Sequence, residues 1–252
     1  GLIEMRDGNN GEYFNGTVTD VTYAAATSKV TIATSAAYLG DMMKCNLSDT
    51  GGVINIGDQL YYYTDWSCND DGTYTFTIDN VKSDQPISSA KIRSTAMIGA
   101  EVDYQGVPYY MEQMNEWIRG FAEKVNGIFT EGVTAEGNDA GILITGNYVT
   151  TKGQYTEAEL NDSKKNGKGY YYITAGNLAI ASDLIKDASL LGTRSSASNG
   201  VEECKQVEKV ISMLSDKNQY SFRGREAGGF LECVLSDAAL NASNANTFYK
   251  TY

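Results

Sequence analysis

The sequence predicts an α+β protein, in which an elongated helical bundle or coiled-coil-like rod carries an inserted antiparallel β domain and a second, small loop-rich β region. Three observations lead to this fold class. Residues 11–105 are rich in β-branched and aromatic residues, three later segments repeat apolar residues every three or four positions, and glycine-rich polar sequence lies among them. Because the β-rich sequence interrupts helical sequence, we interpret it as an insertion into a helical domain.

These observations divide the chain into three parts. The helical rod comprises residues 1–10, 106–132 and 177–252. The inserted β domain comprises residues 11–105, and the loop-rich hairpin region comprises residues 133–176. With 252 residues the chain is long enough for one large or two ordinary domains, each with a core of its own.

The β domain contains four segments of strand composition, at residues 16–23, 29–34, 59–64 and 73–78. In the last of these, Tyr74, Phe76 and Ile78 alternate with threonines and therefore point to one face of a strand. Residues 87–98 alternate in a similar way. Turn-forming residues such as those at 69–72 separate the strands, which predicts a small antiparallel sheet or barrel.

Three amphipathic helices are predicted from apolar residues at alternating spacings of three and four. The first stripe consists of Met111, Met114, Ile118, Phe121, Val125 and Ile128. The other two consist of Val201, Cys204, Val207, Ile211 and Leu214, and of Leu231, Leu235, Ala238, Ala242, Ala245 and Tyr249. Pro108 suits the first turn of the first helix, and Gly132 follows its end. We expect the three helices to pack alongside one another.

The region between the first and second helices is glycine-rich and polar. Its short apolar pieces, at residues 142–144 and 170–173, indicate loops and hairpins, and residues 156–160 suit a short helix.

Composition excludes several classes of chemistry. The chain has no histidine, which removes Ser-His and Cys-His nucleophile pairs and histidine metal ligands. A formal net charge of −12 argues against binding to a phosphate backbone. No stretch approaches the roughly 20 apolar residues that span a bilayer, and the first six residues lack the layout of a signal peptide. We therefore expect no nucleic-acid partner and no membrane association.

Two short motifs resemble catalytic or metal-binding sequences. Residues 69–72 are similar to part of a calcium loop with Ser67, Asn69 and Asp71 as early ligands, but Ile78 stands where the closing glutamate belongs, so a hairpin turn is the better interpretation. Ser88 and Lys91 have the Ser-x-x-Lys spacing, which needs a helix to bring the two side chains together, whereas this segment alternates like a strand.

The remaining candidates are tyrosines, arginines and cysteines. The triplets at residues 61–63 and 170–172 have the aromatic character of a sugar-binding surface, although tyrosine is also a favoured strand residue. Arg223 and Arg225 are a candidate anion site, or part of a loop before a helix whose N-terminal end favours Glu226. The cysteines are Cys45, Cys68, Cys204 and Cys233, whose wide spacing rejects a zinc ribbon and leaves structural thiols or disulfides. We predict no catalytic, cofactor-binding or metal-binding residues, and no enzyme.

Several segments, in order along the chain, resemble the bacterial flagellar hook-associated protein 1 family, the hook-filament junction proteins. Residues 1–10, with the sequence GLIEMRDGNN, resemble the end of a helix followed by an Arg-Asp-Gly turn, and residues 106–129 resemble the next helix of the family. Further similar segments are residues 130–132, 137–141, 175–180, 183–185 and 221–222, and the helix from Phe230. The inserted β domain lies where many members pass directly from the turn into the helix, and Asp139 is not followed by the usual Phe.

The resemblance implies a structural protein rather than an enzyme. It implies secretion through the flagellar export apparatus, an extracellular location in the flagellum and assembly as a ring between hook and filament. The implied partners are copies of the chain itself, the hook protein, the second junction protein and an export chaperone. The terminal helices of the family are absent, so we expect the chain to be a central fragment. The alternatives are a surface module that binds carbohydrate or a host through the β domain, and a flagellin-like filament subunit.

Overall fold

The computed structural model describes residues 6, 13–34, 47, 51–69, 71–83, 86–99, 105–149, 151–161, 168–221 and 225–251. The chain divides into two compact units. The first unit combines residues 1–119 with 155–176, and the second combines residues 120–154 with 177–252. The division falls within one continuous helix.

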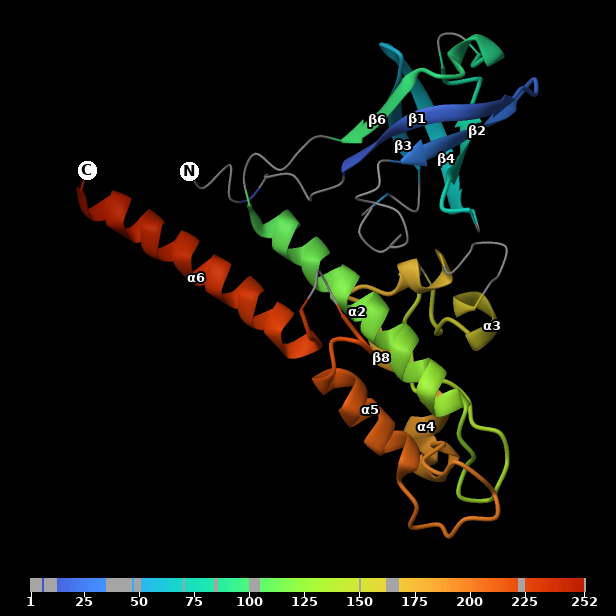
Figure 1. The fold of residues 1–252 in the computed structure, drawn as a ribbon, viewed down its shortest axis with the longest axis vertical. Coiled ribbons are helices and arrows are strands. Elements are labelled where there is room, and N and C mark those ends of the chain that lie inside the picture. The colour runs from blue at the N-terminus through green and yellow to red at the C-terminus, as the bar shows by residue number, and fades with distance from the viewer. Residues whose placement is uncertain are drawn as a thin grey trace. The chain divides into compact units, whose positions relative to one another are not determined.

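Six antiparallel strands of the first unit form a closed barrel (Figure 1). They are β1 (Tyr13–Thr22), β2 (Thr27–Thr34), β3 (Gly52–Ile56), β4 (Gln59–Cys68), β5 (Tyr74–Asp79) and β6 (Thr95–Gly99). Around the barrel the order is β1-β2-β5-β4-β3-β6, and β6 pairs with β1 to close it. Closure leaves every strand with two neighbours, so no barrel edge is open to pairing.

Alternating side chains fill the barrel interior, with register shifts between Val18 and Asp20 in β1 and between Tyr63 and Asp65 in β4. Tyr74, Phe76 and Ile78 of β5 are buried, as the sequence predicts, while the threonines between them are partly exposed. Phe14 contacts the rings of Tyr74 and Phe76 edge-on, at centroid distances of 5.1 and 5.3 Å. Trp66 is also buried in this core. Each such side chain contributes about 1.5–3 kcal/mol by burial, so the barrel has a substantial core of its own.

Two of the barrel connections contain residues with positive φ. β3 and β4 are joined by a tight turn in which Gly57 and Asp58 both have positive φ, at 54° and 63°, as a type I′ hairpin requires. The strand predicted over residues 87–98 is only partly correct. A 3₁₀ helix, η2 (Ser89–Lys91), occupies its first part, and the chain turns at Arg93, with a φ of 73°, before β6 begins.

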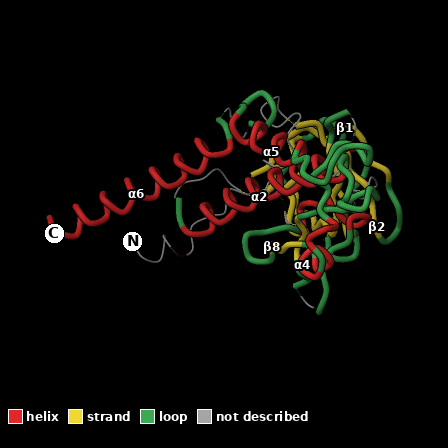
Figure 2. The backbone as a smooth tube through the Cα atoms, turned by 90° about the horizontal axis from the view of Figure 1, so that it is seen from below, coloured by secondary structure: helices red, strands yellow, loops and turns green. Residues whose placement is uncertain are grey.

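The longest helices are α2 (Val107–Thr130) and α6 (Ala227–Thr251), both visible in Figures 1 and 2. The prediction for α2 is confirmed, with Pro108 in its first turn and Gly132 just after its end. The other helical elements are α3 (Glu157–Leu160), η4 (Lys168–Tyr172), α4 (Ser182–Lys186), η5 (Ala188–Leu190) and α5 (Lys205–Ser215). A capping box between Thr156 and Glu159 begins α3, which confirms the short helix predicted there. A two-stranded sheet consists of β7 (Ile144–Gly146) and β8 (Leu178–Ile180).

The predicted helical bundle or coiled-coil-like rod is wrong. The architecture instead combines a closed six-stranded barrel with helices that do not bury their apolar stripes against one another. In α5 the buried side chains are Gln206 and Met213, whereas Ile211 of the predicted stripe is 62% exposed. In α6, Leu235 and Tyr249 are 71% and 84% exposed. A three-four spacing defines a face that is suited to burial, but it does not specify which surface covers that face.

Candidate functional site

Helix α2 buries a stripe of polar side chains on one face, formed by Asn115, Arg119 and Asn126. Gln113 and Glu116 are buried on other sides of the helix, and none of the five is more than 6% exposed. Asn115, Arg119, Ala122 and Asn126 follow one another at spacings of four, three and four, so they share one face of the helix. Buried polar side chains need hydrogen-bond partners, and here many of the partners are backbone groups of other segments.

Arg119 links α2 to the η4 segment within the first unit. Its guanidinium lies 3.8 Å from the centre of the Tyr171 ring, and its Nε donates to the Ile173 carbonyl at 3.1 Å. The Glu112 carboxylate lies 3.9 Å from Nη1 and supplies a counter-charge. Tyr171 in turn contacts Trp66 of the barrel core edge-on, at 5.2 Å between ring centres. One arginine therefore connects the first half of α2 to the barrel through two aromatic rings.

Asn115 extends the same connection by one turn. Its Oδ1 accepts from the Ala175 backbone N–H at 2.9 Å, and its Nδ2 donates to Glu112 at 3.0 Å. Arg119 and Asn115 thus hold the backbone of residues 173–175 against the helix. This segment has no strand neighbour in the described structure, so side-chain amide and guanidinium groups replace the hydrogen bonds of a sheet.

Asn126 has the equivalent role in the second unit. Its Oδ1 accepts from the backbone N–H groups of Leu143 and Ile144, at 3.0 and 2.8 Å, and its Nδ2 donates to the Ile144 carbonyl at 2.7 Å. The side chain is 1% exposed. It therefore covers the outer edge of β7 as a neighbouring strand would.

A second buried arginine, Arg194, holds two loops of the second unit together. Its Nη1 donates to the Asn199 carbonyl at 2.8 Å, and its Nη2 donates to the carbonyls of Thr134 and, at 2.9 Å, Ala135. Its own carbonyl accepts from the Val133 N–H at 2.9 Å. Both Nη atoms donate to carbonyl dipoles, whereas the buried Nε has no hydrogen-bond partner among the described groups. The carbonyl contacts hold the turn that follows α2.

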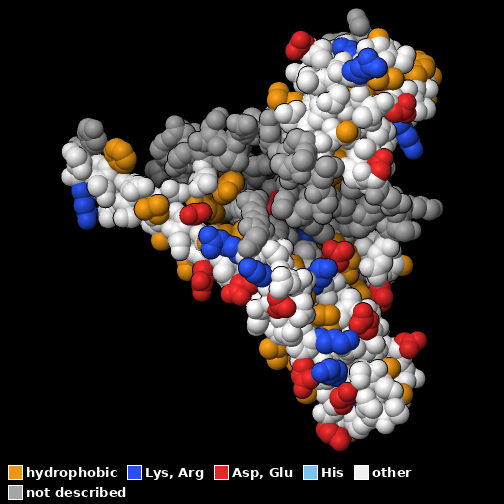
Figure 3. All heavy atoms as spheres, in the orientation of Figure 1, with side chains coloured by type: hydrophobic (Ala, Val, Ile, Leu, Met, Phe, Trp, Pro, Cys, Tyr) orange, Lys and Arg blue, Asp and Glu red, His pale blue; other side chains and the backbone are white. Residues whose placement is uncertain are grey.

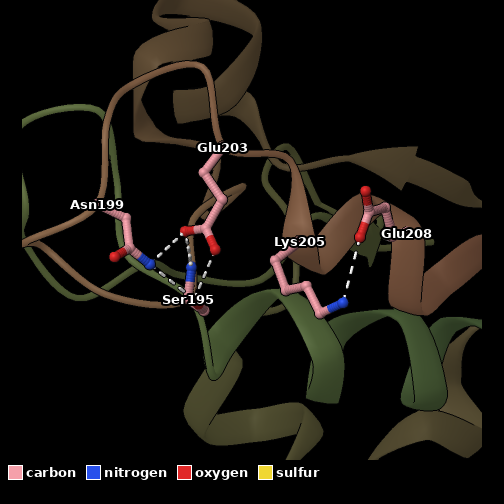
Figure 4. A network of polar contacts seen from close by, with 5 residues as sticks. All are labelled: Ser195, Asn199, Glu203, Lys205 and Glu208. Carbon is pink, nitrogen blue, oxygen red and sulfur yellow. Dashed lines mark hydrogen bonds and ion pairs between the residues drawn. The ribbon is translucent and has the colours of Figure 1, made fainter.

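Beside this arginine, a carboxylate organises the next loop (Figure 4). Glu203 accepts from the Ser195 backbone N–H at 3.0 Å, from the Ser195 hydroxyl at 2.8 Å and from the Asn199 amide at 2.8 Å. The hydrogen bond from the Asn199 side chain, followed by those from Ser195, lowers the pKa of the Glu203 carboxyl below its ordinary value. A carboxylate held ionised by three donors is a weak proton acceptor, so a positioning role suits it better than general-base chemistry.

The two motif candidates lie at turns. Asn69, Asp71 and Gly72 lie between β4 and β5. Asp71 accepts from the hydroxyl and the backbone N–H of Thr73 at 2.7 and 3.0 Å, which lowers the pKa of its carboxyl. The hairpin-turn interpretation is therefore confirmed. Lys91 donates to the Gly57 carbonyl at 3.3 Å and lies over the Tyr61 ring. The Lys91 ammonium therefore contacts the Gly57 carbonyl and the Tyr61 ring rather than the Ser88 hydroxyl.

The tyrosine triplets are mostly structural. Tyr61 and Tyr63 point into the barrel, and Tyr170 and Tyr171 are also buried. Tyr62, 37% exposed, is the exception in its triplet. The alternation of strand β4 accounts for the first triplet, whereas the second triplet belongs to η4. Neither triplet presents a contiguous row of exposed rings.

The arginine and cysteine candidates are only partly within the described residues. Arg225 is exposed just before α6, while Arg223, Cys45 and the side chain of Cys68 lie outside the described residues. Cys204 and Cys233 are free thiols; Cys204 is exposed and Cys233 is half-buried. Over the described ranges, no group of three or more acidic or cysteine side chains is placed to hold a metal ion. No helix among those described is both long and apolar enough to cross a membrane.

The described polar clusters share one property, since each holds backbone groups in place. No protein-family profile and no curated protein matches the sequence.

The sequence interpretation missed this stripe because it followed the apolar residues of α2 alone. The signal that would have found the stripe is the recurrence of Asn115, Arg119 and Asn126 at helical spacing between the apolar residues of α2.

Proposed function

We propose that the chain is a structural subunit of the bacterial flagellum, of the kind that the hook-associated junction proteins represent. The observation that carries this proposal is the exposed apolar seam of α6. Leu235, Ala242, Ala245 and Tyr249 recur every three, four or seven residues along this helix and are exposed. Figure 3 shows hydrophobic side chains spaced along the length of α6.

Helix α6 is poorly suited to exist alone in water. Residues 239–251 are all exposed, and among them Asn, Ser and Thr, which are weak helix formers, are frequent. Isolated helices without tertiary packing are marginal even when their composition is favourable. A partner that covers the seam would supply the missing stabilisation, and small alanines at its centre allow that partner to approach closely.

A neighbouring subunit of an axial assembly fits this requirement. The proposal places the chain outside the cell in the flagellum, exported by the flagellar apparatus and held in a ring with copies of itself. The hook protein, the second junction protein and an export chaperone are its proposed partners. The net charge of −12 favours solubility before assembly.

Deletion of the gene in the bacterium that carries it tests the function. We expect hooks without filaments in electron micrographs and flagellin released into the medium. Intact filaments in the deletion strain would overturn the proposal.

Complementation then tests the seam separately. The double variant Leu235→Asp, Tyr249→Asp places two charges on the seam, whereas the matched control Asn244→Asp places a charge on the other side of the helix. We expect the control to restore filaments and the double variant to fail. If both restore filaments, the seam is not the assembly surface even though the flagellar function holds.

The same deletion strain distinguishes the proposed function from two alternatives. A flagellin-like subunit would make up the filament itself, so its loss would leave no flagellin-like protein outside the cell. A carbohydrate- or host-binding module in the barrel would leave filaments intact, and the burial of Tyr61 and Tyr63 makes the barrel a less suitable sugar-binding surface.

A further inference from the structure

The small sheet of the second unit has an unusual outer edge. Strands β7 and β8 pair antiparallel, with Ile144 opposite Ile180 and Gly146 opposite Leu178. Leu178 and Ile180 are 41% and 43% exposed, although the three residues of β7 are buried. Figure 2 shows β8 beside α4, the helix that follows it.

The hydrogen bonds beyond the strand ends fix which groups face outward. Asn147 donates its N–H to the Asn177 carbonyl at 2.8 Å, and Ala181 donates to the Leu143 carbonyl at 3.0 Å. Bonded pairs alternate along an antiparallel ladder, so Ala179 directs its polar groups toward β7. Leu178 and Ile180 therefore direct theirs away from β7, toward the open side of β8.

The two outer edges of this sheet are covered differently. Asn126 satisfies both polar groups of Ile144 on the β7 side. On the β8 side, Gln154 donates from Nε2 to the Ile180 carbonyl at 3.0 Å and accepts at Oε1 from the Ser182 N–H at 2.8 Å. The N–H and carbonyl of Leu178 and the N–H of Ile180 have no hydrogen bond to another described residue.

We propose that the open edge of β8 binds an extended polypeptide segment, with apolar residues at alternate positions, as a third strand of the sheet. The outward N–H groups of Leu178 and Ile180 and the Leu178 carbonyl select an extended backbone. A helical segment could not pair with them, because its backbone N–H and carbonyl groups already bond to one another. Leu178 and Ile180 are two residues apart and share one face, so they select apolar side chains at alternate positions of the incoming segment.

A second copy paired through β8 alone does not suit this edge. The strand has three residues, whereas a stable dimer buries about 800 Å² on each partner. A short extended segment needs much less surface, because its main-chain hydrogen bonds supply much of the affinity.

Gln154 competes with such a segment. Its side-chain amide occupies the Ile180 carbonyl and the Ser182 N–H in the way that a backbone amide of a third strand would. An incoming strand that pairs along the whole of β8 must displace it. Removal of this side chain therefore lengthens the open edge and strengthens binding.

The test is an NMR titration of the ¹⁵N-labelled chain with the peptide Ser-Val-Thr-Val-Thr-Val-Ser. We expect the amide signals of Leu178 and Ile180 to shift more than that of Ala179. We also expect Ile180→Pro to weaken binding by about two- to tenfold, the effect of one lost hydrogen bond. Proline removes only an outward N–H at this position and spares the ladder to β7. Ile180→Val, the matched control, keeps that N–H and the wild-type affinity.

Gln154→Ala provides a variant with the opposite expectation, a tighter complex by a similar factor. A peptide with its three central amides N-methylated is expected not to bind, since it cannot pair with a strand edge. The proposal is overturned if the peptide leaves Leu178 and Ile180 unshifted, or if the N-methylated peptide binds as well as the unmodified one. Equal affinity of wild type, Ile180→Pro and Gln154→Ala would also overturn it.

Discussion

Replacement of Asn126 by alanine should destabilise the second unit more than any surface substitution. The change removes two hydrogen bonds to backbone N–H groups and one to a carbonyl, at 2.7–3.0 Å. Each buried polar group left without a partner costs about 1–3 kcal/mol. Because Leu143 is only half-buried and water can reach it, the two groups of Ile144 dominate, and we expect a loss of about 2–6 kcal/mol.

Urea unfolding followed by circular dichroism measures this loss, and amide hydrogen exchange locates it. We expect the Ile144 amide to lose its protection, since its acceptor is gone. Asn138→Ala is the matched control, because Asn138 is exposed and its amide makes a single bond of 3.4 Å to Glu136. A loss below about 1 kcal/mol for Asn126→Ala, the range of an ordinary surface change, with unchanged exchange at Ile144 would refute the reasoning.

Three further changes test other contacts. Arg119→Lys keeps the charge but loses the planar contact with Tyr171 and the bond from Nε, so we expect a loss of about 2 kcal/mol, measured by tryptophan fluorescence during urea unfolding; an unchanged midpoint would contradict the role of the guanidinium. Gly132→Ala places a Cβ 2.4 Å from the Gly192 carbonyl oxygen, and we expect about 1–3 kcal/mol of destabilisation in the same assay, whereas wild-type stability would show that the turn relaxes freely. Glu203→Gln tests the lowered pKa of that carboxyl: the folded-state pKa lies below the ordinary 4.5, so its stabilisation is present above pH 4.5 and is lost as the pH falls through the folded value. The melting temperatures of wild type and Glu203→Gln should therefore differ at pH 7, and this difference should shrink as the pH falls below 4.5. A difference that stays constant with pH would exclude the carboxylate as the cause.

The barrel was largely predictable because its information is local. Tyr74, Phe76 and Ile78 alternate with threonines, and such alternation defines a strand with one buried face wherever it lies. The segment Gly52–Ile56 was not predicted as a strand, since its short run follows a cluster of turn residues and gains its identity from pairing with β4 and β6. Closure also depends on pairing between β1 and β6, which are far apart in sequence.

For the helices, the sequence predicted their positions but not their packing partners. The spacing of apolar residues located α2, α5 and α6, yet the predicted packing of the three stripes against one another was wrong. In α2 the contacts depend on Asn115, Arg119 and Asn126, whose partners are backbone groups 17 to 60 residues away. No local pattern specifies those partners. A buried amide can donate to any carbonyl or accept from any N–H that the fold brings near, and a buried guanidinium can donate to any such carbonyl.

The sequence by itself determined the positions of most strands and of the long helices, and it excluded histidine chemistry. These properties depend on side-chain size, polarity and spacing over a few residues, which the chain carries wherever it folds. Only the tertiary structure decided that the strands close into a barrel, that Arg119 and Asn126 hold backbone segments in place of strands, and that the outer edge of β8 has no neighbouring strand among the described residues. Those features depend on hydrogen-bond partners distant in sequence, and a backbone donor or acceptor has no residue identity from which its partner can be inferred.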